Sequence, residues 1–139
     1  MIVSGYFENI FSSDCHLSDP KITDARLVVC VRDIGVIAGH PLYEKIGHSA
    51  IRFFRNGHLI FDGVEASLRE LTEFIGNPKD RVFSEPRLIK DGPFPKRSQP
   101  TMVFRFEGAP NLPYSWVDWT VIAASFSLEI LDSREPSWS

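Results

Sequence analysis

The chain offers few residues whose types and spacing could carry chemistry. Its histidines and cysteines are His16, His40, His48, His58, Cys15 and Cys30. No two histidines are four residues apart and the cysteines do not form a CxxC pair, so the spacing does not predict a zinc site. The sequence also lacks the GxxxxGK[ST], GxGxxG and GxSxG motifs, and so gives no support to phosphate-loop, dinucleotide-binding or α/β-hydrolase chemistry. We therefore expect no metal and no cofactor.

Composition places the chain among ordinary globular proteins. Of its 139 residues 43% are hydrophobic, and the net charge of -3 provides no basic surface for nucleic acid. This length suits one domain spanning residues 1–139. The two cysteines are too few for a disulfide framework, the N-terminus has no secretory signal pattern, and charged residues interrupt the most apolar stretch, 116–131. A cytoplasmic protein without a membrane span or a nucleic-acid partner is expected.

Several segments have the pattern of β-strands. Residues 25–32 form a continuous β-branched run that is typical of a central strand. Residues 49–55 and 58–62 flank Asn56-Gly57, a dipeptide favoured in two-residue type I′ turns, which predicts a β-hairpin. Further strands are expected at 82–89, 102–107 and 126–130.

Two segments are expected to be helical. Ser67 to Glu70 matches a capping box, and the apolar residues of 68–75 fall on one helical face before Gly76. Ser115, followed three residues later by Asp118, has the pattern of a second helix start. The sequence thus predicts an α+β fold, with a small antiparallel sheet on which two or so helices pack.

The segment 46–63 resembles a known arrangement. A histidine, His48, opens a strand, and an apolar run, a tight turn and a returning strand with a polar residue follow. Together with the preceding strand, Leu27 to Asp33, this pattern is similar to the hairpin of circularly permuted papain-like proteins, namely PPPDE peptidases, lecithin:retinol acyltransferase-like proteins and permuted NlpC-type amidases. The resemblance covers residues 25–65 and implies a hydrolase for a peptide, amide or thioester bond. It assigns His48 the role of general base.

The resemblance also implies a nucleophile at the start of a later helix. Those families have a cysteine there, whereas this chain has Ser115. Three interpretations stay open: an ordinary helix cap, a replacement of a nucleophilic cysteine, or a working serine nucleophile. Asp62 or Glu65 would orient His48. Glu65 lies across from His48 if the hairpin pairing continues, and Asp62 is nearer the third polar residue of these families.

Two alternatives accompany this interpretation. In the unpermuted order Cys15 would be the nucleophile, although Pro20 conflicts with the long helix which that order requires. The chain could instead be a non-catalytic inhibitor, immunity or adaptor module that binds a protein or peptide through Trp116, Trp119 and Trp138. A large exposed aromatic patch in the structure would favour this binding function.

Overall fold

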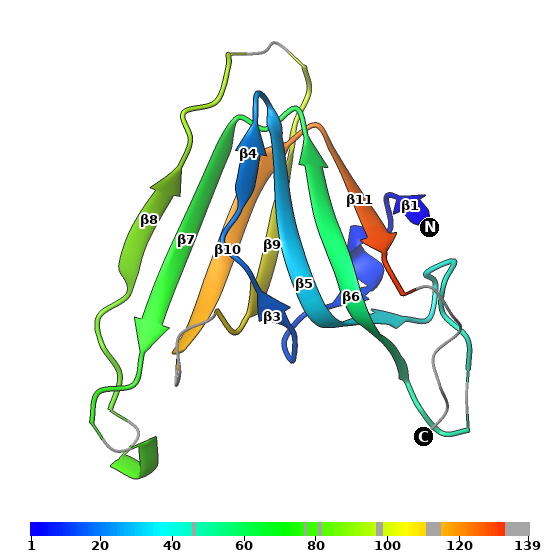
Figure 1. Cartoon of the computed structure of the whole chain (residues 1–139), viewed down its shortest axis with the longest axis horizontal. Coiled ribbons are helices and arrows are strands. Elements are labelled where there is room, and N and C mark those ends of the chain that lie inside the picture. The colour runs from blue at the N-terminus through cyan, green and yellow to red at the C-terminus, as the bar shows by residue number, and fades with distance from the viewer. Residues whose placement is uncertain (46, 77, 81, 97–98, 111–114, 133–139) are drawn as a thin grey trace.

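The fold consists almost entirely of antiparallel β-sheet. The computed structural model describes residues 1–45, 47–76, 78–80, 82–96, 99–110 and 115–132. Strands dominate the described residues, whose only helical parts are two short 3-10 turns, Phe7–Asn9 and Pro78–Asp80. Figure 1 shows two sheets that meet at one end, the closed end of the fold, and spread apart at the other, the open end. The predicted α+β class is therefore wrong.

The larger sheet has seven strands and is built around two long ones. These are β5 (Arg26–Ile37) and β6 (Ile51–Asp62), which pair along almost their whole length. The shorter strands are β1 (Ile2–Ser4), β2 (Ile10–Phe11), β3 (His16–Leu17), β4 (Lys21–Thr23) and β11 (Ser125–Ile130). The order is β1-β11-β6-β5-β2, and β3 and β4 also pair with β5. The strands expected at 25–32 and 126–130 are confirmed.

The smaller sheet has four strands in the order β8-β7-β10-β9. They are β7 (Ala66–Glu73), β8 (Arg87–Asp91), β9 (Met102–Gly108) and β10 (Ser115–Ala123). The strand expected at 102–107 is confirmed. The one expected at 82–89 begins later, at Arg87.

The chain crosses between the sheets twice at the closed end of the fold. β6 continues into β7 through Gly63, and β10 continues into β11 through Ala124. The two crossings are bonded to each other, because the Ala124 N–H donates to the carbonyl of Asp62 at 3.0 Å. Gly63 has a φ of 65°, and a Cβ at this position would lie 2.7 Å from the Cβ of Ala124. Both backbone angle and space therefore require glycine here.

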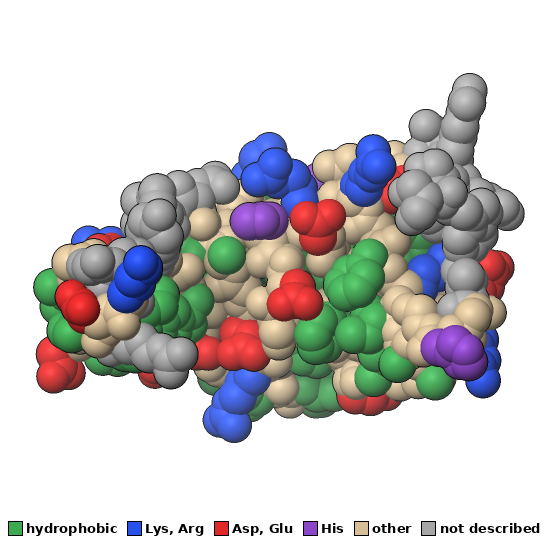
Figure 2. Space-filling view, turned by 90° about the horizontal axis from the view of Figure 1, so that it is seen from below, with side chains coloured by type: hydrophobic (Ala, Val, Ile, Leu, Met, Phe, Trp, Pro, Cys, Tyr) green, Lys and Arg blue, Asp and Glu red, His purple; other side chains and the backbone are tan. Residues whose placement is uncertain are grey.

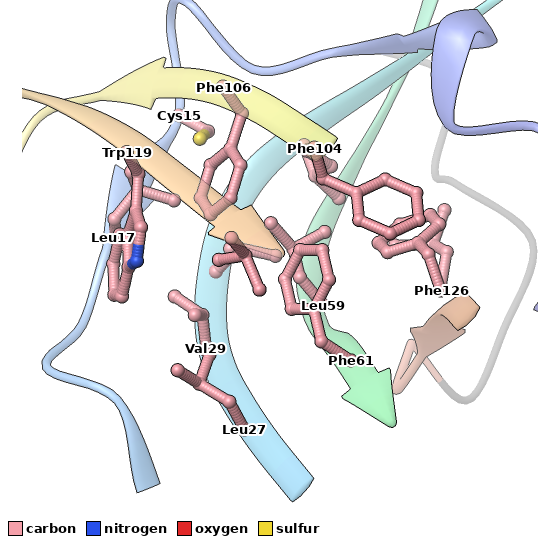
Figure 3. Packing of buried hydrophobic residues seen from close by; sticks show 14 of the residues in the cluster. Cys15, Leu17, Leu27, Val29, Leu59, Phe61, Phe104, Phe106, Trp119 and Phe126 are labelled. Carbon is pink, nitrogen blue, oxygen red and sulfur yellow. The ribbon is translucent and has the colours of Figure 1, made fainter. Parts of the chain in front are cut away.

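Aromatic side chains fill the wedge between the sheets (Figure 3). The Phe61 ring lies 5.5 Å from Phe104, 5.6 Å from Phe106 and 5.2 Å from Phe126, measured between ring centroids. Phe106 in turn stacks on Trp119 at 5.3 Å. Phe61 and Phe126 belong to the larger sheet and the other three to the smaller one, so the sheets share one core. Burial of each ring stabilises this contact by about 1.5–3 kcal/mol.

The predicted hairpin at Asn56-Gly57 is wrong, because both residues lie inside β6. The carboxylate of Asp132 accepts hydrogen bonds from the N–H groups of Arg55 and Asn56 at 2.9 and 3.1 Å. These bonds satisfy backbone donors in the middle of an extended strand. Gly57 is buried, and a Cβ there would lie only 2.8 Å from the carbonyl oxygen of Glu129 on β11. Close approach of two strands, not a turn, explains this glycine.

Both predicted helices are also wrong, because residues 66–73 form β7 and Ser115 begins β10. The helical appearance of β7 has a physical cause. Its inward positions include Ser67 and Arg69, two polar residues that hide the alternation expected of a strand.

These inward polar residues belong to a hydrogen-bond network at the β8 edge of the smaller sheet. Ser67 Oγ accepts a hydrogen bond from Trp119 Nε1 at 2.8 Å and donates one to Asp91 Oδ2 at 2.7 Å. Arg69 Nη2 donates to Asp91 Oδ1 at 2.7 Å, and the guanidinium lies 5.1 Å from the centre of the Trp119 ring. The network satisfies polar groups that would be costly to bury alone.

The substitution Gly57→Ala tests the close approach of β6 and β11. We expect it to lower the free energy of unfolding by about 1–3 kcal/mol, because the added methyl group forces the backbone of β11 away. Urea denaturation followed by tryptophan fluorescence measures the change. Asn56→Ala, at the exposed neighbouring position, should shift stability by about 0.5 kcal/mol or less. Equal stability of the two variants would contradict the packing described for Gly57.

The substitution Ser67→Ala tests the inner network. It leaves the Trp119 N–H buried without its partner, so we expect a loss of about 1–3 kcal/mol in the free energy of unfolding. Ser4→Ala is the matched control, since the Ser4 hydroxyl bonds to Ser127 Oγ at an exposed position. If both variants unfold at the same urea concentration as the parent, the network does not stabilise the fold.

Candidate functional site

The residues expected to form a hydrolase site do not come together. His48 is exposed in the turn that leads into β6, whereas Asp62 is the last residue of that strand. A strand of 12 residues extends about 40 Å at its usual rise. Asp62 instead forms an ion pair with Arg26, with 2.7 Å between Oδ1 and Nε.

Ser115 and Glu65 are separated in the same way. Ser115 begins β10, where it pairs with Glu73, so it caps no helix. The Glu65 N–H bonds to the carbonyl of Ile122 at the opposite end of β10. Figure 1 also places the starts of β6 and β10 on opposite sides of the open end of the fold. The implied hydrolase activity stays a prediction, but these four residues form no common site for it.

The alternative nucleophile Cys15 is also unsuitable. Its side chain is 0% exposed, and burial raises the pKa of its thiol to about 12. At neutral pH the group is therefore a protonated thiol inside the core, and no reagent in solution reaches it.

An aromatic cluster lies at the open end of the smaller sheet. The rings of Phe74, Phe83 and Trp116 lie 4.7–5.8 Å apart, and Phe83 is 46% exposed. Ile75 and Val82 beside them are about half exposed and are joined by a backbone hydrogen bond of 2.7 Å. Of the tryptophans expected to bind a partner, Trp116 lies here, Trp119 is in the core, and Trp138 lies outside the described residues.

An acidic row crosses the same sheet beside this cluster. Asp118 on β10 is directly opposite Glu70 on β7 and Glu107 on β9. Partial burial, followed by repulsion from Glu107 and Glu70, raises the pKa of Asp118 above its ordinary value. Glu107 also accepts a hydrogen bond from Ser13 Oγ at 2.8 Å. Within the described part of the chain none of the three carboxylates forms an ion pair.

The aromatic cluster and the acidic row share the outer face of the smaller sheet. Val117 and Trp119 point into the core, so the alternating residues Trp116 and Asp118 point outward. An open hollow of about 500 Å³ adjoins the row and includes Arg105 in its lining. In Figure 2 hydrophobic and acidic side chains reach the surface together on the side of β7 and β8.

Sequence reasoning missed this surface for identifiable reasons. Val117, Trp119 and Val121 alternate with Asp118 and Thr120 as in a strand, but the pattern that begins at Ser115 favours a helix start. Phe74 and Phe83 are separated by a connecting segment, and only an isolated bridge between them in the folded chain makes them neighbours. No pattern of neighbouring residues in the sequence predicts such a pair.

The substitution Asp118→Asn tests whether the charge of Asp118 is unfavourable in the acidic row, where it is partly buried and repelled by Glu107 and Glu70. Since the pKa of Asp118 is raised in the folded state, its charged form weakens folding above that pKa, and stability returns as the pH falls toward the ordinary value of 3.8. We expect the variant to melt at a higher temperature than the parent near neutral pH. The difference should shrink toward pH 3.8. A variant that is less stable at neutral pH would contradict an unfavourable charge on Asp118.

Neither a metal centre nor a membrane helix is found in the parts of the chain that the structure describes. They contain no group of three or more His, Cys, Asp or Glu residues arranged to hold a metal ion. No helix in them is long and apolar enough to cross a membrane. Comparison with protein-family models, with curated proteins and with solved structures gave no match.

Proposed function

We propose that this chain is a protein-binding module that recognises a basic protein with the outer face of its four-stranded sheet. One observation carries the proposal. The exposed aromatic cluster of Phe74, Phe83 and Trp116 adjoins three carboxylates that have no cationic partner among the described residues.

The aromatic cluster supplies the apolar anchor of such an interface. Aromatic side chains that are buried on binding carry a large share of the affinity of protein interfaces. Leu88 on β8 is 60% exposed and extends the apolar surface, since it is paired with Glu70 of the acidic row. An apolar area bordered by charges is the usual composition of an interaction site.

The acidic row determines the charge of the partner. Cross-strand neighbours have Cβ atoms about 4.5–5.5 Å apart, so like charges there repel. In the free protein, partial burial and then this repulsion raise the pKa of Asp118. An arginine or lysine side chain from a partner would relieve this repulsion, whereas an acidic partner would increase it. A basic partner therefore fits the row.

Peptide titration followed by NMR tests the proposal. We expect short peptides that combine arginine with leucine to shift the indole signal of Trp116 and the amide signals of β7 and β10. Phe83→Ala should weaken binding about tenfold or more, because it removes an anchor. The double variant Glu70→Gln with Glu107→Gln should weaken binding and reduce its salt dependence.

Two control variants remove similar groups elsewhere. Phe53→Ala removes a ring that is 42% exposed on β6, and Glu65→Gln removes a carboxylate at the closed end of the fold. Both should bind like the parent. The proposal fails if peptides with glutamate in place of arginine bind equally well, or if the basic peptides leave the Trp116 signal unchanged.

A further inference from the structure

A second cluster of reactive side chains lies on the larger sheet, away from the proposed binding face. Cys30 on β5 pairs directly with His58 on β6, and His58 pairs directly with Glu129 on β11. The three residues form one row across three strands, and all are partly accessible. Cys30 and His58 line a cavity of about 380 Å³. A thiol, an imidazole and a carboxylate in this order are the groups used for nucleophilic catalysis.

Glu129 orients the imidazole of His58. Its Oε1 lies 2.7 Å from His58 Nδ1, and the two side chains are about equally exposed, at 27% and 28%. An ionised carboxylate only accepts hydrogen bonds, so Nδ1 carries the proton of the neutral ring. The other nitrogen, Nε2, then has a free lone pair and is the atom that accepts a proton.

The position of Cys30 is held by its backbone. Ser18 Oγ accepts a hydrogen bond from the Cys30 N–H at 2.9 Å, and the Ser18 N–H donates to the Cys30 carbonyl at 3.0 Å. These two bonds hold the backbone of Cys30, and Cys30 lines the same cavity as His58. The other cysteine, Cys15, is fully buried. The two thiols of the chain therefore differ sharply in access.

We infer that Cys30 is a nucleophilic thiol that takes an acyl group from an activated ester or thioester, with His58 as its base. His58 Nε2 accepts the thiol proton as Cys30 Sγ forms a bond to the acyl carbonyl carbon. The bond from that carbon to the leaving oxygen or sulfur breaks, and the leaving group takes the proton from His58. The products are a thioester on Cys30 and an alcohol or thiol. Glu129 is a positioning residue.

The cavity also indicates which acyl donors fit. Arg32 and Asn56 are paired with each other two residues along from Cys30 and His58, and both line the cavity. Their side chains donate hydrogen bonds, and Arg32 adds positive charge. Donors with an anionic or carbonyl-rich group are therefore favoured over purely apolar ones.

Acylation by p-nitrophenyl acetate tests this inference. With the full chain at neutral pH, we expect release of nitrophenolate equal to one acyl group per chain. Peptide mass spectrometry should place that group on Cys30 and leave Cys15 unmodified. This comparison needs no variant, so it holds even if a substitution impairs folding. Acetylation of Cys15, or of lysines without Cys30, would overturn the inference.

Variants then separate the roles of the two partners. His58→Gln should slow acylation about 100-fold, in the range of general-base catalysis. His48→Gln, in the exposed turn that precedes β6, should leave the acylation rate unchanged. Glu129→Gln should give a smaller loss, and NMR of the His58 ring nitrogens should show the Nδ1 proton less favoured. Equal rates for His58→Gln and the parent, with both folded by circular dichroism, would refute the role of His58.

Discussion

The structure depends on one aromatic core that two sheets share. Each sheet has an apolar inner face that would be exposed if the sheet stood alone. The crossings at Gly63 and Ala124 join the sheets at one end, and Phe61 contacts aromatic rings from both sheets within the wedge. Because the inner faces are covered by each other, both outer faces are left for solvent and for ligands.

The polar network beside this core holds the functional surface in register. Ser67, Arg69 and Asp91 link β7 to β8, and the Trp119 indole links them to β10. These bonds lie on the inner face, but they fix the same strands whose outer residues form the acidic row. An inner hydrogen bond therefore determines which carboxylates face one another outside, since pairing on one face of a sheet sets pairing on the other.

The two outer faces offer different chemistry by the same structural means. On the smaller sheet, cross-strand pairing gathers carboxylates from β7, β9 and β10 beside aromatic rings. On the larger sheet, pairing gathers Cys30, His58 and Glu129 from three strands. In both cases the residues that come together are far apart in sequence, and strand pairing sets the distances between their side chains. Nearest-neighbour patterns along the chain do not contain this information.

Local patterns determined part of the fold by themselves. The β-branched run at 25–32 and the alternation at 102–107 and 126–130 indicated strands because side-chain packing on a pleated sheet favours those residues. Tertiary contacts decided the rest. Asn56-Gly57 stays extended because Asp132 satisfies its backbone and β11 passes close to Gly57. β7 forms a strand because its inward polar side chains, Ser67 and Arg69, hydrogen-bond to Asp91. Such partners come from distant segments, so only the folded chain reveals them.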